Sequence, residues 1–419
     1  MRFVSLLVLL AACVAAADEV PESHLTPGLH WEEGFAFKTA DEAFELRLLG
    51  IVQADFRGYF NAHDTTDYDR FLVRRARLYV EGTVMKAVDY RWMVDFGNGE
   101  PSILDAFANA RIFGPALQLR AGKFKQPFSM EQFVMEDLTL VVFERSLIDT
   151  LAPARNVGLM IHGRDVGGVL DYQLSVANGL RDSDFEEKRN EKDLLGRVAV
   201  RPFARWEGAP APLARLQLGA SASWGREADD VDPASFSTPL RVRWFRFTEG
   251  TRAVGDRFRL SPELQAFWGP VGVSAQLVGQ WQQLASPSGV TGEARVQGFY
   301  GLATWVLTGE HRTSYAEFIH PAKPFDFLHP LAGSGALELV LRASGLRVLG
   351  AAAGGDFVDA AKVSTGAFEV SVGLNWYLSR FAWVMVDYEH AVFSSPVALG
   401  GPTGAVASNA AAIRTTVMW

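Results

Sequence analysis

The sequence has almost no cysteine, and its single one, Cys13, lies close to the N-terminus. A mature chain that begins after this position can therefore form no internal disulfide. Long apolar runs are missing as well. Although 48% of the residues are hydrophobic, no stretch beyond the N-terminus reaches the roughly 18 uncharged apolar residues of a transmembrane helix. The formal net charge of -8 argues against a nucleic-acid-binding protein.

Signatures of catalysis are also missing. The eight histidines are scattered, and none lies in an HExxH context, nor does the chain contain GxSxG. No metal-ligand spacing and no phosphate-cradling glycine loop occur either. We therefore expect no catalytic residue, no metal, no cofactor and no enzymatic activity. A sugar-binding or adhesive protein is disfavoured too, because the long polar connections are mostly charged or small rather than rich in Trp and Tyr.

The N-terminus has the features of an export signal. Arg2 is followed by a short apolar run, and a group of alanines ends at Ala17, which predicts a signal peptide over residues 1–17. The segment around Cys13 also resembles a lipoprotein cleavage site, so lipidation of Cys13 is an alternative to cleavage after Ala17. Residues 18–41 are polar and aperiodic, and we interpret them as a short periplasmic segment.

From Phe44 onward, segments of about ten residues alternate between apolar and polar positions, which is typical of β-strands in a transmembrane barrel. One example places Leu218, Ala220, Ala222 and Trp224 on one face and Gln217, Gly219, Ser221 and Ser223 on the other. In a soluble β-sandwich the apolar face would be the core. In a membrane barrel it would face lipid, and the polar face would line the lumen.

Three features favour the barrel. Aromatic residues cluster near the ends of the expected strands, short and long connections alternate, and the chain ends in an alternating strand with Trp419 as its last residue. We count about sixteen candidate strands, so residues 42–419 are expected to form an all-β, 16-stranded antiparallel barrel. The long third extracellular loop, within 120–156, is expected to fold into the lumen. Residues 311–335 would then be an unusually long periplasmic turn.

Five motifs resemble the phosphate-selective porin O and P family, and the resemblance extends from about Phe44 to Trp419. The motifs are RFLVRRARL at 70–78, AGKFKQPFSMEQ at 121–132, FERSL at 143–147, LTGE at 307–310 and GLNWY at 373–377. The resemblance implies a homotrimer of sixteen-stranded barrels surrounded by the lipid of a bacterial outer membrane. It also implies that the third extracellular loop narrows each pore and that arginines and lysines line it.

The resemblance further implies which residues meet at the constriction. Arg74 and Arg75 would lie on the barrel wall, Arg145 would come from the inward-folded loop, and Asp105 would hold these arginines in orientation. Gln132 departs from the family pattern, because phosphate-selective members have a lysine at this position. High-affinity phosphate binding is therefore in doubt.

The residues considered alone give a partly different arrangement. Strict alternation places Arg75 and Arg77 on the water-facing side of their strand but Arg74 on the apolar side. Arg74 would then extend toward the membrane interface, unless a β-bulge redirects it. Lys123 and Lys125 at the start of the long loop lie either at the pore mouth or on a solvated surface.

Arginines prevail over lysines on the polar faces, and Arg120 is among those expected to line the pore. Guanidinium groups in series can pass an oxyanion from one bidentate contact to the next. A transverse arrangement, with arginines on one wall facing acids on the other, is the alternative. The sequence therefore predicts a porin for the passive diffusion of small anions, with phosphate or polyphosphate as the best candidate; the alternative is a general non-selective diffusion porin of the same fold.

Overall fold

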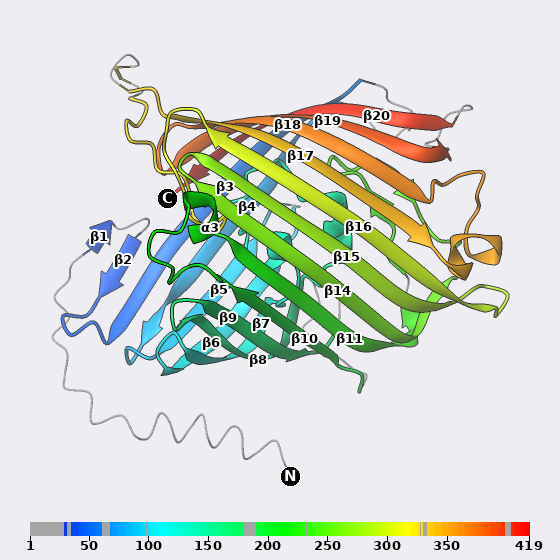
Figure 1. Cartoon of the computed structure of the whole chain (residues 1–419), viewed down its shortest axis with the longest axis horizontal. Helices are drawn as coiled ribbons and strands as arrows, with labels where there is room; N and C mark the ends of the chain where they lie inside the picture. The colour runs from blue at the N-terminus through cyan, green and yellow to red at the C-terminus, as the bar shows by residue number, and fades with distance from the viewer. Residues whose placement is uncertain are drawn as a thin grey trace, which may run out of the picture.

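Most of the described chain forms one antiparallel sheet that closes on itself (Figure 1). The computed structural model describes residues 29–31, 35–60, 68–97, 99–179, 190–231, 233–326, 328–329, 333–398 and 404–419. The sheet has eighteen strands; β1 and β2 are short additions, and the other sixteen form the barrel. β20 pairs with β3, with Ile413 opposite Phe56, and this pairing closes the ring. The expected 16-stranded barrel is confirmed.

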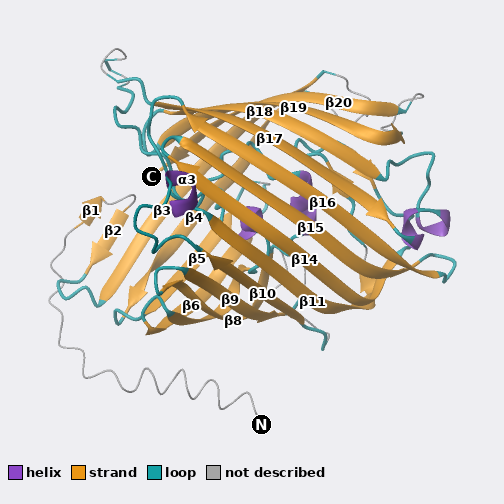
Figure 2. Cartoon of the chain, viewed as in Figure 1, coloured by secondary structure: helices purple, strands orange, loops and turns teal. Residues whose placement is uncertain are grey.

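Each barrel strand pairs with the barrel strand before it and the one after it (Figure 2). The strands are β1 Leu29–Trp31, β2 Phe35–Lys38, β3 Phe44–Tyr59, β4 Arg70–Val84, β5 Val88–Asp95, β6 Ser102–Phe113, β7 Leu117–Lys125, β8 Arg155–Val166, β9 Leu170–Ala177, β10 Asp193–Val200, β11 Gln217–Val231, β12 Phe236–Ser237, β13 Arg243–Phe245, β14 Arg252–Trp268, β15 Val271–Ala285, β16 Thr291–Val306, β17 Ala336–Leu349, β18 Gly366–Tyr377, β19 Ala382–Val397 and β20 Ala405–Met418.

The helices of the described chain are short and lie in the connections. They are α2 Met130–Phe133, α3 Ala211–Ala214, and the 3-10 helices η1 Leu147–Leu151, η2 Ala351–Ala353 and η3 Gly355–Phe357. Among the described residues, no helix has the length and apolar character needed to cross a membrane.

The two faces of the barrel strands differ as a membrane barrel requires. In β11, Leu218 and Trp224 are 42% and 48% exposed, whereas Ser221 and Ser223 are 2% and 3% exposed. A sandwich would bury the apolar face instead. The apolar residues therefore form the outer surface, and the polar residues point toward the barrel interior.

The N-terminal region is more ordered than its sequence suggests. β2 pairs with the start of β3, with Ala36 opposite Arg47, and β1 pairs with β2. These short strands lie within the segment that we expected to be aperiodic. The predicted signal peptide and Cys13 lie outside the described residues.

The long connection between β16 and β17 lies at the same end of the barrel as the short turns, as the strand count predicts. Its described residues pack against the inner wall. Arg312 donates to Glu338 of β17 at 2.7 Å, and the buried Tyr315 lies against Phe267 of β14 with 4.9 Å between ring centroids. This connection is thus a packed part of the barrel rather than a loose linker.

One side of the barrel interior is apolar. Val278 of β15, Leu302 of β16 and Leu346 of β17 are buried on the inner faces of their strands. They belong to a core cluster that also contains Leu147 of the connection between β7 and β8, and Trp244 of β13. The polar lining expected from the alternation therefore does not extend around the whole wall, because connecting segments pack against part of it.

Candidate functional site

The connection between β7 and β8, residues 126–154, is bonded to inner-face side chains of several strands. The Ser129 amide donates to Ser221 Oγ of β11 at 3.0 Å, and the Phe143 amide donates to Asp387 of β19 at 2.9 Å. Asn375 of β18 donates to the Val141 carbonyl at 2.7 Å. β18 and β19 are neighbours, whereas β11 lies on a separate part of the ring, so the connection is fixed at two separate places on the wall.

Glu144 is the charged centre of this connection. Its Oε1 lies 2.6 Å from Nε of Arg74, 2.7 Å from Nη2 of Arg57 and 3.0 Å from Nη2 of Arg414. Burial alone would raise the pKa of the Glu144 carboxyl, but Arg74, Arg414 and Arg75 outweigh burial and hold this pKa well below its usual value. Glu144 is therefore ionised and joins arginines from β3, β4 and β20.

Asp137 gathers a second set of arginines. It pairs with Arg75 at 3.2 Å, with Arg145 at 3.0 Å, and with Arg77, which also pairs with Asp95 at 2.7 Å. Burial would raise the pKa of the Asp137 carboxyl, but the three arginines hold it well below the usual value. The structure thus brings the predicted residues Arg74, Arg75, Arg77 and Arg145 together, each paired with a carboxylate.

A β-bulge brings Arg74 into this group. Gln53 of β3 is opposite Arg75, but the next residue, Ala54, is opposite Val73, so Arg74 is the extra residue of β4. A bulge changes the direction in which a side chain points. The conflict between strict alternation and the family resemblance is resolved in favour of the resemblance, because Arg74 bonds Glu144 and does not extend toward the membrane interface.

Asp55 and Arg57 belong to this site but were not predicted from the sequence. Asp55 pairs with Arg414 at 2.7 Å and with Arg57 at 2.9 Å, and all three are buried. The alternation of Gln53, Asp55 and Arg57 along one face of β3 was the available signal. We call the group of Asp55, Arg57, Arg74, Arg75, Arg77, Asp95, Asp137, Glu144, Arg145 and Arg414 the arginine–carboxylate cluster.

Asp105 and Gln132 lie outside the cluster. Asp105 pairs with Arg155 of β8 at 2.8 Å, and within the described chain it has no bond to Arg74, Arg75 or Arg145. The expectation that Asp105 orients those arginines is therefore wrong. Gln132 is buried in α2, and its Oε1 has no hydrogen-bond partner among the residues that the structure describes. Arg145 passes beside this helix and donates to the Glu131 and Met135 carbonyls.

The remaining predicted residues take different positions. Lys125 pairs with Glu136 at 2.9 Å. Lys123 is buried at 1% exposure and is not a solvated surface charge. Arg120 lies over the ring of Phe107, with 4.3 Å between its Cζ and the ring centroid. Among the described residues, no group of His, Cys, Asp and Glu side chains is arranged to hold a metal ion.

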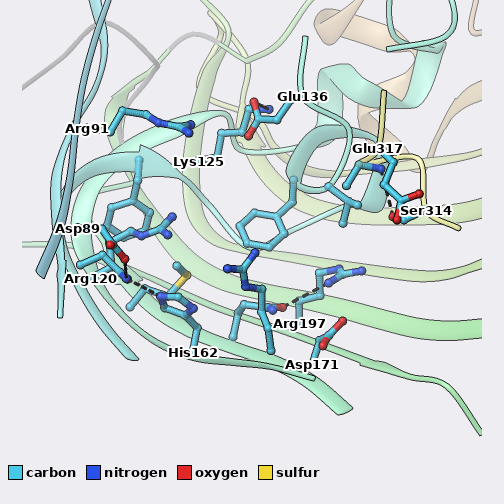
Figure 3. Close-up of a pocket in the computed structure, with 18 of the residues that line it drawn as sticks. Asp89, Arg91, Arg120, Lys125, Glu136, His162, Asp171, Arg197, Ser314 and Glu317 are labelled. Carbon is cyan, nitrogen blue, oxygen red and sulfur yellow. Dashed lines mark hydrogen bonds and ion pairs between the residues drawn. The ribbon is translucent and has the colours of Figure 1, made fainter. Parts of the chain in front are cut away.

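Arg120 and Lys125 line a cavity of about 920 Å³, which we call the chamber (Figure 3). Arg91 and Arg120 line it on one wall, Arg197 and Asp171 on another, and Glu136 borders it from the connection between β7 and β8. The lining carries eight basic residues (Arg47, Arg91, Arg120, Lys125, Arg164, Arg197, Arg201 and Arg215) and seven acidic ones (Glu45, Glu81, Asp89, Asp105, Glu136, Asp171 and Glu317). The chamber is thus strongly polar with nearly balanced charge.

Solved structures of several outer-membrane proteins share the fold. They include the anion-selective porin of Comamonas acidovorans (13% identity, 90% of this chain and 100% of that chain covered, TM-score 0.52). The channel DcaP of Acinetobacter baumannii is also similar, with 10% identity, 91% of this chain and 99% of that chain covered, and a TM-score of 0.54. OmpT of Vibrio cholerae has 10% identity, with 90% of this chain and 98% of that chain covered, and a TM-score of 0.56.

A comparison with curated proteins finds no match. The family model of the phosphate-selective porins O and P matches residues 46–392, which is most of the chain. Together with the closed barrel and its apolar outer surface, this match points to a channel in the bacterial outer membrane rather than an enzyme. The chain belongs to the phosphate-selective porin O and P family.

Proposed function

We propose that this outer-membrane porin passes small solutes passively with a modest preference for anions, and that phosphate or polyphosphate is its best candidate solute. We further propose that residues 126–154 lie in the lumen and narrow it. The bonds of this connection to β11, β18 and β19 support that position. The apolar cluster that it shares with the inner faces of β15, β16 and β17 supports it too.

The charge of the arginine–carboxylate cluster is the observation that carries the anion preference. The cluster holds six arginines against four carboxylates, Asp55, Asp95, Asp137 and Glu144, so its formal charge is +2. Asp149, 3.9 Å from Arg145, lowers this surplus to +1 when it is ionised. A narrow passage with a positive surplus concentrates anions and repels cations.

The same pairing argues against tight phosphate binding. Each arginine of the cluster is already paired with a carboxylate, and a phosphate would have to compete for guanidinium groups that are engaged. Gln132 adds no positive charge. We therefore propose that phosphate passes through weak contacts, which also allows it to leave the pore quickly.

The zero-current potential of the purified protein in a planar bilayer tests this proposal. Under a potassium chloride gradient we expect an anion-selective potential, and we expect added phosphate to reduce the single-channel current only at high concentration. A potential near zero or of cationic sign would refute the anion preference. Saturating block by dilute phosphate would show instead that the arginines form a dedicated phosphate site.

A general diffusion porin is the second candidate function. The near balance of eight basic and seven acidic residues around the chamber favours it. Its expected potential is close to zero, so the same measurement separates the two.

We also propose a homotrimer, as the family resemblance implies. A trimer form is known for the similar OmpT of Vibrio cholerae. Analytical ultracentrifugation of the protein in detergent tests the trimer, and a monomer mass would refute it.

A further inference from the structure

The chamber is larger than a small inorganic anion requires. Phe133, Val134 and Glu136 border it from the connection between β7 and β8. The connection between β16 and β17 contributes Thr313, Ser314, Ala316 and Glu317. Its volume of about 920 Å³ falls in the range of roughly 300–1,000 Å³ that binds drug-sized organic ligands. The chamber therefore has room for an organic solute between these two segments.

Most cations of the chamber have acidic partners. Arg91 pairs with Glu81 at 2.8 Å, Lys125 with Glu136 at 2.9 Å, and Arg201 with Asp171 at 3.2 Å. Arg197 is bonded to Glu263 of the adjoining wall at 2.9 Å. These groups are neutralised locally and offer little net attraction to an anion.

Arg120 differs from these residues. Within the described part of the chain it forms no ion pair and no hydrogen bond, and its Nε is buried without a partner. Its guanidinium is held against Phe107, with 4.3 Å from Cζ to the ring centroid, and lies 5.8 Å from the centroid of Phe124. Contact with an aromatic ring restrains the guanidinium plane and leaves its N–H edges free to bind a planar carboxylate.

Apolar side chains accompany this free guanidinium. Phe124 and Met160 are buried beside it, and Met160 is the cross-strand neighbour of Arg120 on β8. Phe133 and Val134 supply apolar surface on the side of α2. A ligand with one carboxylate and one flat apolar group would satisfy both kinds of surface, whereas phosphate would satisfy only the cation.

We propose that the chamber binds aromatic monocarboxylates, with the carboxylate on Arg120 and the ring against the partly exposed Phe133 and Val134 side chains. This inference rests on the proposed diffusion function and adds a solute class to it. Binding is reversible and noncovalent, so the chamber is a site through which such solutes pass.

Calorimetric titration of the folded protein in detergent with benzoate, and with acetate as a probe that lacks the ring, tests this proposal. We expect benzoate to bind more tightly than acetate. Arg120→Lys keeps the charge but loses the planar fork and its ring contact, so benzoate affinity should fall by about tenfold or more. Arg164→Lys is the matched control, because Arg164 also lines the chamber but is exposed, and its affinity should stay within about twofold of the wild type.

Equal affinities for benzoate and acetate would overturn the proposal, as would equal losses in Arg120→Lys and Arg164→Lys. Phe107→Leu removes the ring beneath the guanidinium while keeping Arg120, and it should also weaken benzoate binding. This variant tests the proposal if Arg120→Lys does not fold. Calorimetry is independent of ion selectivity. A wild-type zero-current potential near zero would thus refute the anion preference alone, and a failure of benzoate binding would refute the chamber site alone.

Discussion

Replacing Glu144 with glutamine removes a carboxylate that Arg57, Arg74 and Arg414 share. The formal charge of the arginine–carboxylate cluster would rise by one. A unit charge about 5 Å from a passing ion in water-like surroundings changes the ion's free energy by about 0.8 kcal/mol. This is about fourfold in concentration, with opposite signs for anions and cations. We therefore expect the anion-to-cation permeability ratio to rise by about sixteenfold.

The substitution should also loosen the connection between β7 and β8. Arg57 and Arg414 retain Asp55 as a partner, whereas Arg74 bonds only Glu144 among the carboxylates of the cluster and would keep a single, uncharged acceptor in place of two charged ones. Hydrogen bonds to charged groups contribute about 1.5–3 kcal/mol each, so we expect a loss of about 3 kcal/mol in the anchoring of this connection. The temperature above which the protein no longer migrates as a folded barrel in gel electrophoresis should fall accordingly.

The zero-current potential in a planar bilayer under a potassium chloride gradient measures the selectivity of the variant. Glu144→Asp is the matched control, because it keeps the charge and should keep a potential near that of the wild type. If Glu144→Gln folds and conducts with an unchanged potential, the cluster does not lie on the ion path. The reasoning from its charge would then be refuted.

Three further changes test other parts of the structure. Burial raises the pKa of Asp149 to about 7, with Arg145 opposing and Glu131 and Asp137 adding to the rise. Asp149 therefore gains negative charge as the pH rises from about 6 to about 8. The anion selectivity of the wild type, measured as a bilayer potential, should decline over that interval, and that of Asp149→Asn should not. Asp105→Asn removes the carboxylate 2.8 Å from Arg155 and should cost about 3 kcal/mol in thermal stability. Because Asp105 also lines the chamber, its loss should shift the zero-current potential toward anion selectivity, in the same direction as Glu144→Gln. Gly122 has a φ of 124°, and an added Cβ would lie 2.2 Å from the Ala106 carbonyl oxygen. Gly122→Ala should therefore lower the yield of folded barrel in a refolding assay. Gly301→Ala is the control and should not lower it, because a Cβ at Gly301 meets open space.

The barrel itself could be predicted from the sequence because the strand pattern and the alternation of connections repeat along the chain. The strand count also predicted at which end of the barrel the long connection before β17 lies. It did not predict how this connection packs around Arg312 and Tyr315. Alternation assigns a side chain to one of two faces, but it does not determine which residues meet across the interior. That depends on the path of residues 126–154 and on the pairing register.

The site shows the same division between local and long-range information. Arg74, Arg75 and Arg145 were located by resemblance, and the bulge that admits Arg74 is a local break in β4. Asp105 was assigned to the wrong partner because β6 and β8, which lie on either side of β7, place it next to Arg155. Asp55 and Arg57 were overlooked because their role appears only when β20 returns to β3 and brings Arg414 beside them.

The pairing of Asp55 with Arg414 joins two residues that are 359 positions apart. This contact lies at the seam where the last strand meets the first barrel strand, so it can form only after almost the whole chain has been exported. Until then the part of the β3 edge beyond its pairing with β2, from Ile51 to Tyr59, is unpaired and could associate with other chains. Closure of the seam is therefore a late step in assembly, and contacts so distant along the chain predict slow folding. The buried bidentate ion pair would then hold the ring shut once the two edges have met.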